Sequence, residues 1–141
     1  MKCNECSNAM AKGELELRRT VAGRDFSTVV EGWSCSVCGN RVYRAPDAIA
    51  FEESIAQELA ANGPVTGESF AAMRAALRLR SADVAGLLGV ANETISRWEN
   101  SKRRMDRSAW FILSTLVLDW ADGSRATIER LENLRGKAAS A

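Results

Sequence analysis

The sequence contains no histidine, and this absence excludes several classes of site at once. A histidine general base, a cysteine–histidine dyad and a Cys2His2 zinc finger all need an imidazole. The sequence also lacks a glycine-rich phosphate loop of the Walker type and the G-x-S-x-G nucleophile motif. We therefore expect a protein that is not an enzyme.

Long apolar runs are missing as well. No stretch approaches about 18 consecutive apolar residues, so the sequence predicts no membrane-spanning helix. The N-terminus, MKCNECSNAM, has no apolar core after its lysine and does not resemble a secretory signal. With 46% hydrophobic and 26% charged residues, the composition is typical of a soluble globular protein, and we expect a cytoplasmic location.

Only four cysteines occur, and their spacing is the clearest signal in the N-terminal third. They form two C-x2-C pairs, Cys3 with Cys6 and Cys35 with Cys38. Two such pairs can present four thiolates to one Zn²⁺, and because four ligands fill its coordination sphere, we expect a structural zinc. An iron site of the rubredoxin kind uses the same ligands and stays open. Disulfides are disfavoured in a cytosolic chain, and a thioredoxin-like pair would need a βαβ setting that is missing.

The chain between and after the cysteine pairs predicts a small ribbon. Residues 14–21 and 26–33 are expected to be strands, and residues 22–25 supply a turn between them. A third extended piece is expected at residues 41–44. With so few apolar residues, this ribbon would be marginally stable without its metal.

A helix with an acidic face is expected at residues 47–61. Its apolar residues repeat at helical spacing and form one stripe: Ala48, Phe51, Ile55 and Leu59. We favour a helix docked on the ribbon over an acidic surface offered to a basic partner. Glycine and proline in residues 62–67 resist continuing the helix, and this segment is expected to be a hinge.

The C-terminal half predicts five helices, at residues 68–79, 81–88, 92–100, 107–120 and 125–134. The second and third are short and are joined at Gly89, which favours the left-handed conformation that ends a helix. The expected inward residues of this pair are Ala85, Leu88, Ile95 and Trp98. Two helices joined in this way are typical of a helix-turn-helix, whose second helix enters the DNA major groove.

Basic residues gather around this pair of helices. Between residues 74 and 107 there are eight basic residues against four acidic ones. A local excess of this kind favours contact with phosphates. The candidate DNA-binding residues are Ser81, Asn92, Glu93, Thr94, Ser96, Arg97, Lys102, Arg103 and Arg104.

These candidates divide into residues that read bases and residues that position the protein. Arg97 can donate two hydrogen bonds to guanine, Asn92 can read adenine, and Glu93 can accept from cytosine. The three consecutive basic residues 102–104 would contact phosphates, which position a protein without specifying sequence. Thr94 and Ser96 are short enough for phosphates or a thymine methyl. Glu99 is expected to pair with a neighbouring arginine or to cap local structure.

The helix expected at residues 107–120 is apolar nearly all round. A helix of that kind is buried on both sides. Because the helix that follows is short, we expect a homodimer formed through these last two helices.

The segment LRLRSADVAGLLGVANETISRWENSKR resembles the Cro/C1-type (XRE) helix-turn-helix family. A CxxC...CxxC ribbon placed before such a domain resembles the MqsA (YgiT-type zinc finger) antitoxin family, and the resemblance covers residues 1 to about 120. It differs at two reading positions. Glu93 stands where that family has asparagine, and Arg80-Ser81 stands where Cro/C1-type proteins often have Ser/Thr-Gln.

The resemblance implies a two-part protein. A zinc domain at residues 1–61, ligated by the four cysteines, would bind and neutralise a toxin, commonly an mRNA interferase. After a linker at 62–67, a helix-turn-helix domain at 68–135 would dimerise and repress its own operon by binding a palindromic operator, with Arg97 contacting bases. Residues 136–141 would be a tail.

Two other functions remain open from the sequence. The chain could be a zinc-ribbon helix-turn-helix transcription regulator without a toxin partner. It could also be a rubredoxin-like redox sensor fused to a DNA-binding domain, in which case the metal would be iron.

Overall fold

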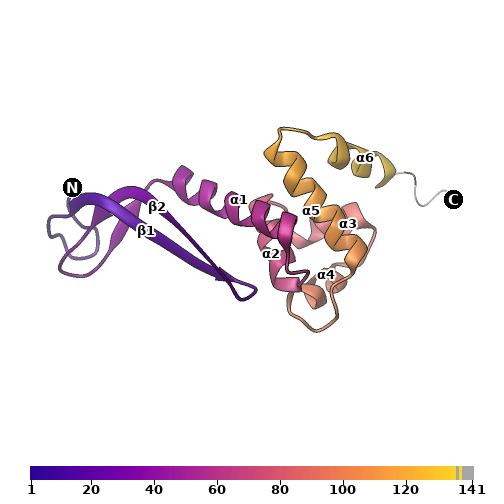
Figure 1. The fold of residues 1–141 in the computed structure, drawn as a ribbon, viewed down its shortest axis with the longest axis horizontal. Helices are drawn as coiled ribbons and strands as arrows, with labels where there is room; N and C mark the ends of the chain where they lie inside the picture. Colours follow the sequence, from indigo (N-terminus) through magenta and orange to yellow (C-terminus); the bar gives the residue numbers. More distant parts are fainter. Residues whose placement is uncertain (136, 138–141) are drawn as a thin grey trace. The chain divides into compact units, whose positions relative to one another are not determined.

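The computed structural model describes residues 1–135 and residue 137, and within them an antiparallel sheet is followed by helices (Figure 1). The expected tail, residues 136–141, lies outside the described residues apart from Lys137. The sheet has the order β1-β2-β3. Its strands are β1 (Ala11–Val21), β2 (Arg24–Ser34) and β3 (Arg41–Tyr43). The helices are α1 (Ala45–Asn62), α2 (Gly67–Ala76), α3 (Ser81–Leu88), α4 (Asn92–Glu99), α5 (Arg107–Ala121) and α6 (Ala126–Arg135).

The chain forms two compact units, Met1–Phe51 and Glu52–Ala141, and the division falls inside α1. This differs from the boundaries that the sequence led us to expect. Ile55 and Leu59 of the apolar stripe are buried in the second unit, where the same half of α1 lies against α2 and α5. The expected hinge at residues 62–67 also lies within the second unit, because the helix before it is already packed there.

The hairpin of β1 and β2 follows from its alternating pattern. Leu15, Leu17 and Val21 are buried on one face of the sheet, while the residues between them are exposed. Val21 pairs with Arg24, and the two residues between them have positive φ angles of 52° and 75°, as in a type I′ turn. The expected strands are confirmed, but both are longer than expected, and the turn is shorter because Arg24 and Asp25 belong to β2.

The helical unit is built around a small apolar core. Phe70 and Trp98 meet edge to face, with ring centroids 5.9 Å apart. The fully buried side chains of this core include Leu59, Phe70, Met73, Val84, Ile95 and Leu113. Leu88, expected to be inward, is only partly buried, whereas Val84, one turn earlier, is 1% exposed.

The first turn of α2 presses against the last turn of α4. A Cβ atom on Gly67 would lie 1.7 Å from the backbone oxygen of Trp98, so only glycine fits at this approach. Thr66 caps α2 by accepting a hydrogen bond from the backbone N–H of Ser69 at 3.2 Å. The close approach of Gly67 to Trp98 fixes where α4 ends relative to α2.

Helix α5 is less buried than its composition led us to expect. Trp110, Leu113 and Val117 lie in the core, but Phe111 is 67% exposed and Leu118 is 40% exposed. The core of this small unit covers one side of the helix and leaves an apolar stripe on the other. No described helix is long and apolar enough to cross a membrane.

Candidate functional site

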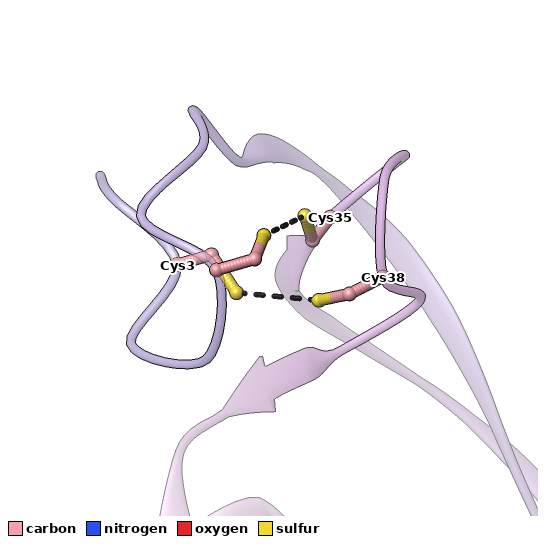
Figure 2. A group of neighbouring side chains, drawn as sticks. Cys3, Cys35 and Cys38 are labelled. Atoms are coloured by element: carbon pink, nitrogen blue, oxygen red, sulfur yellow. Dashed lines mark hydrogen bonds between the residues drawn. The ribbon is translucent and has the colours of Figure 1, made fainter.

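The four cysteines meet at one end of the sheet (Figure 2). All four Sγ atoms lie within 4.8 Å of one another. Cys3 approaches Cys38 and Cys6 approaches Cys35, each with an Sγ–Sγ distance of 3.5 Å. The two pairs therefore interleave, and the site can be filled by one metal ion.

Two turns of the same construction carry these cysteines. The backbone N–H of Cys3 donates to the oxygen of Asn8 at 2.8 Å, and that of Cys35 donates to Asn40 at 2.9 Å. In each turn the residue after the second cysteine has a positive φ angle, 63° at Ser7 and 77° at Gly39. The sequence shows this repeat as CNECSN and CSVCGN, a signal that extends beyond the cysteine spacing used above.

Asparagine side chains support two of the sulfurs, which the spacing alone did not indicate. Asn8 donates from Nδ2 to the Sγ of Cys6 at 3.2 Å, and Asn40 donates to the Sγ of Cys3 at 3.7 Å. Hydrogen bonds of this kind favour thiolates and orient metal ligands. Each asparagine follows its pair of cysteines by two residues.

Thiol acidity differs within the cluster. Burial raises the pKa of Cys3, but backbone N–H groups of Glu5 and Cys6, with Cys38 and Asn40, lower it to about 6. Backbone hydrogen bonds from residues 38 and 37 lower the pKa of Cys35.

The pKa of Cys38 is shifted in the opposite direction. The backbone N–H of Asn40 lowers its pKa, but the thiols of Cys3, Cys6 and Cys35 together with burial raise it to about 12. These pKa directions favour a thiolate at the buried Cys3 and Cys35 over one at the exposed Cys38.

The donor chemistry fits a soft or borderline metal ion. Four sulfur donors with no oxygen or nitrogen ligand suit zinc or iron and disfavour magnesium or calcium. Beside them lies a small apolar cluster, in which Met10 is buried and Trp33 and Val42 are partly buried. The structure thus brings together all four predicted ligands in a site able to bind a metal.

Helix α4 has two chemically distinct faces. Ile95 and Trp98 are 0% and 4% exposed and anchor the helix in the core. Most of the predicted reading residues are exposed on the outer face, namely Asn92, Glu93, Ser96 and Arg97, and Thr94 is partly buried. Before α4, α3 ends at Gly89, whose φ angle is 69°.

The basic segment after α4, residues 102–104, is also exposed to solvent. Its three residues are Lys102, Arg103 and Arg104. Within the described chain, neither these three side chains nor that of Arg97 forms an ion pair. These cations are therefore available to an anionic partner.

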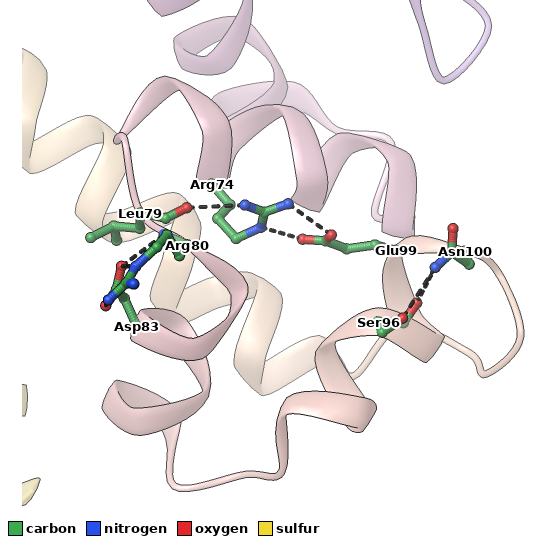
Figure 3. A network of polar contacts seen from close by, with 7 residues as sticks. All are labelled: Arg74, Leu79, Arg80, Asp83, Ser96, Glu99 and Asn100. Carbon is green, nitrogen blue, oxygen red and sulfur yellow. Dashed lines mark hydrogen bonds and ion pairs between the residues drawn. The ribbon is translucent and has the colours of Figure 1, made fainter.

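A bidentate ion pair holds the end of α4 in place (Figure 3). Arg74 of α2 donates from Nε and Nη2 to the two carboxylate oxygens of Glu99, the latter at 2.9 Å. Its Nη1 donates to the backbone oxygen of Leu79 at 3.0 Å, and the Glu99 hydrogen bond raises the pKa of Arg74. The expected pairing of Glu99 with an arginine is confirmed, although the partner comes from α2.

The start of α3 has a second ion pair. The backbone N–H of Arg80 donates to the Asp83 carboxylate at 2.8 Å, and the guanidinium pairs with the same group (Figure 3). These contacts lower the pKa of Asp83. Ser81, a predicted DNA contact, is the first residue of this helix and is partly buried.

Comparison with models of known protein families finds no match, and neither does comparison with curated proteins.

Proposed function

We propose that this protein is an antitoxin that also represses its own operon. An N-terminal unit stabilised by zinc would bind and neutralise a toxin, and a helix-turn-helix in the second unit would bind a palindromic operator. The observation that carries the DNA-binding half is the two-faced helix α4, anchored by Ile95 and Trp98 and exposing Arg97. The toxin-binding half rests on the resemblance of the module order to MqsA-type antitoxins.

Zinc is the proposed metal because the donor set is four cysteines in interleaved C-x2-C pairs. Its role there would be to hold together a unit whose apolar core is small. Metal analysis and the absorption spectrum of the purified protein test this, since one equivalent of colourless zinc is expected. A coloured iron protein would instead favour the rubredoxin-like sensor.

Arg97 is proposed to read a guanine. Replacing it with alanine should weaken binding to the operator by about 5- to 150-fold, because a bidentate arginine–guanine contact is worth about 1–3 kcal/mol. Fluorescence anisotropy with DNA from upstream of the gene, compared with scrambled DNA, measures both affinity and preference. Arg130→Ala on the exposed side of α6 is the matched control and should bind as the wild type does. Equal losses in the two variants would refute the reading role.

Self-association is proposed through the exposed stripe of α5. Phe111 and Leu118 are seven residues apart and therefore lie on one side of the helix. Their exposure leaves apolar surface that a second copy could cover. Sedimentation of a monomer at tens of micromolar would contradict this part.

The toxin is proposed to be a ribonuclease encoded beside this gene. Co-expression with the neighbouring gene, followed by affinity purification, should recover a stoichiometric complex. The complex should survive Arg97→Ala, because the binding unit differs from the one that contacts DNA. If no partner is recovered and operator binding persists, the protein is a transcription regulator without a toxin.

A further inference from the structure

A pocket of about 250 Å³ lies in the second unit between α5, α6 and the connection from α2 to α3. Its apolar lining includes Leu77, Leu116 and Ile128. Charged groups converge on the same space from Asp119, Arg125 and Glu132. An apolar hollow with a few polar groups is typical of small-molecule sites.

Trp120 is the aromatic wall of this pocket and is 50% exposed. The guanidinium carbon of Arg125 lies 5.8 Å from the centre of its ring, so the ring already receives a cation from the protein itself. Asp119 accepts a hydrogen bond from Thr127 at 2.6 Å. Because two carboxylates and one guanidinium line the pocket, its net negative charge favours a positively charged guest over an anion.

This pocket is separate from the stripe proposed for self-association. Trp120 follows Phe111 by nine residues, which at about 100° per residue places the two on opposite sides of α5. The pocket therefore does not belong to the surface defined by Phe111 and Leu118.

Helix α6 connects the pocket to α3. Ile128 and Glu132 of α6 line the pocket, and α6 packs against both α5 and α3. At its end, the Arg135 guanidinium occupies the space left by Gly86, where a Cβ atom would lie 2.5 Å from its carbon. Arg135 also contributes to the lowered pKa of Asp83 at the start of α3.

We propose that this pocket binds a small amphipathic organic cation, with its apolar body on the leucines and its charge beside Glu132, where it replaces the Arg125 guanidinium over the Trp120 ring. Binding shifts α6 and, through it, α3. The regulatory half of this proposal rests on the proposed DNA-binding function, whereas the binding half does not.

Binding is tested on the full chain without DNA, using benzyltrimethylammonium as the probe. A titration followed by the indole N–H signal of Trp120 in ¹H–¹⁵N NMR should give a dissociation constant of about 1 mM, as expected for a ligand of this size. Benzyl alcohol should bind more weakly, and phenylacetate more weakly still. Binding of phenylacetate as tight as that of the cation would overturn the proposed chemistry, as would no binding by any of the three probes.

Two variants separate a charge-specific site from a merely apolar one. Trp120→Leu keeps apolar bulk and should weaken cation binding about fivefold. Glu132→Gln should weaken it about two- to fivefold, with no effect on benzyl alcohol. Glu129→Gln, on the same helix and outside the pocket, is the matched control. Equal effects of Glu132→Gln on the binding of the cation and of the alcohol would contradict a charge-specific site. Cation binding that weakens as the protein concentration rises would mean that self-association covers the pocket, and it would also contradict the proposal.

The coupling to α3 is then measured with operator DNA. At constant ionic strength, benzyltrimethylammonium should change operator affinity at least about threefold in the wild type, and the same change in Trp120→Leu should need about fivefold more probe. If the probe binds and DNA binds but neither affects the other, the regulatory half is wrong. If DNA does not bind at all, the proposed function fails while the NMR result stands.

Discussion

A Cys35→Ser variant is expected to lose the fold of the N-terminal unit and to keep that of the helical unit. The loss should be large, because structural zinc sites in small domains supply about 10–16 kcal/mol of apparent binding free energy that is also folding free energy. Few other residues of this unit are buried, chiefly Met10, Leu15, Leu17 and Val21. Chelation of the metal from the wild type should have the same effect.

The measurement is a ¹H–¹⁵N NMR spectrum of the full chain. Signals from β1 and β2 should collapse to unfolded positions in Cys35→Ser, while those of α2 to α5 remain dispersed. Ser36→Ala, at an exposed position in the same turn, is the matched control and should leave the spectrum intact. A Cys35→Ser spectrum with dispersed strand signals would show that the metal does not hold this unit.

Removing one partner of the Arg74–Glu99 pair is expected to give the second large effect. The two side chains are only 20% and 12% exposed, so Glu99→Ala leaves an arginine largely shielded from water without its carboxylate. Breaking a buried pair costs about 3–5 kcal/mol, and the remaining exposure of this pair places the expected cost nearer about 2–4 kcal/mol. The affinity for operator DNA should fall as well, because α4 loses its attachment to α2.

The free energy of unfolding of the helical unit, measured in urea, gives this cost. Glu93→Ala is the matched control, since Glu93 is exposed on the same helix and should change stability by less than about 0.5 kcal/mol. The double variant Arg74→Met with Glu99→Leu should recover much of the loss, because it removes both charges together. If Glu99→Ala costs no more than Glu93→Ala, the pair does not position α4.

Local patterns in the sequence predicted most of the secondary structure and the metal ligands. Cysteine spacing identified all four members of the candidate metal site because the two turns are short and each is set by neighbouring residues. The strands followed from alternation, and the end of α3 and the start of α4 followed from Gly89 and the polar run after it. These features depend on residues close together in the chain.

Features that depend on distant residues were not predictable in the same way. The division of the chain inside α1 follows from the packing of Ile55 and Leu59 in the second unit. An apolar stripe in the sequence predicts that one side of a helix is buried, but not which element buries it. The pairing of Glu99 with Arg74 spans 25 positions, so charge pattern indicated only that some arginine would be used. The exposure of Phe111 depends on how much of α5 the other helices cover.

Footprinting of the full-length protein on DNA from upstream of its own gene tests whether α4 reads DNA. We expect two protected half-sites whose centres lie about one helical turn apart, or a multiple of it, as for a dimeric helix-turn-helix. Protection should weaken steeply with salt, because the exposed cations after α4 would contact phosphates. The Arg97→Ala variant should lose it at protein concentrations where the wild type protects fully. A chain that protects no site at low salt, or a footprint that Arg97→Ala leaves unchanged, would contradict DNA reading by α4.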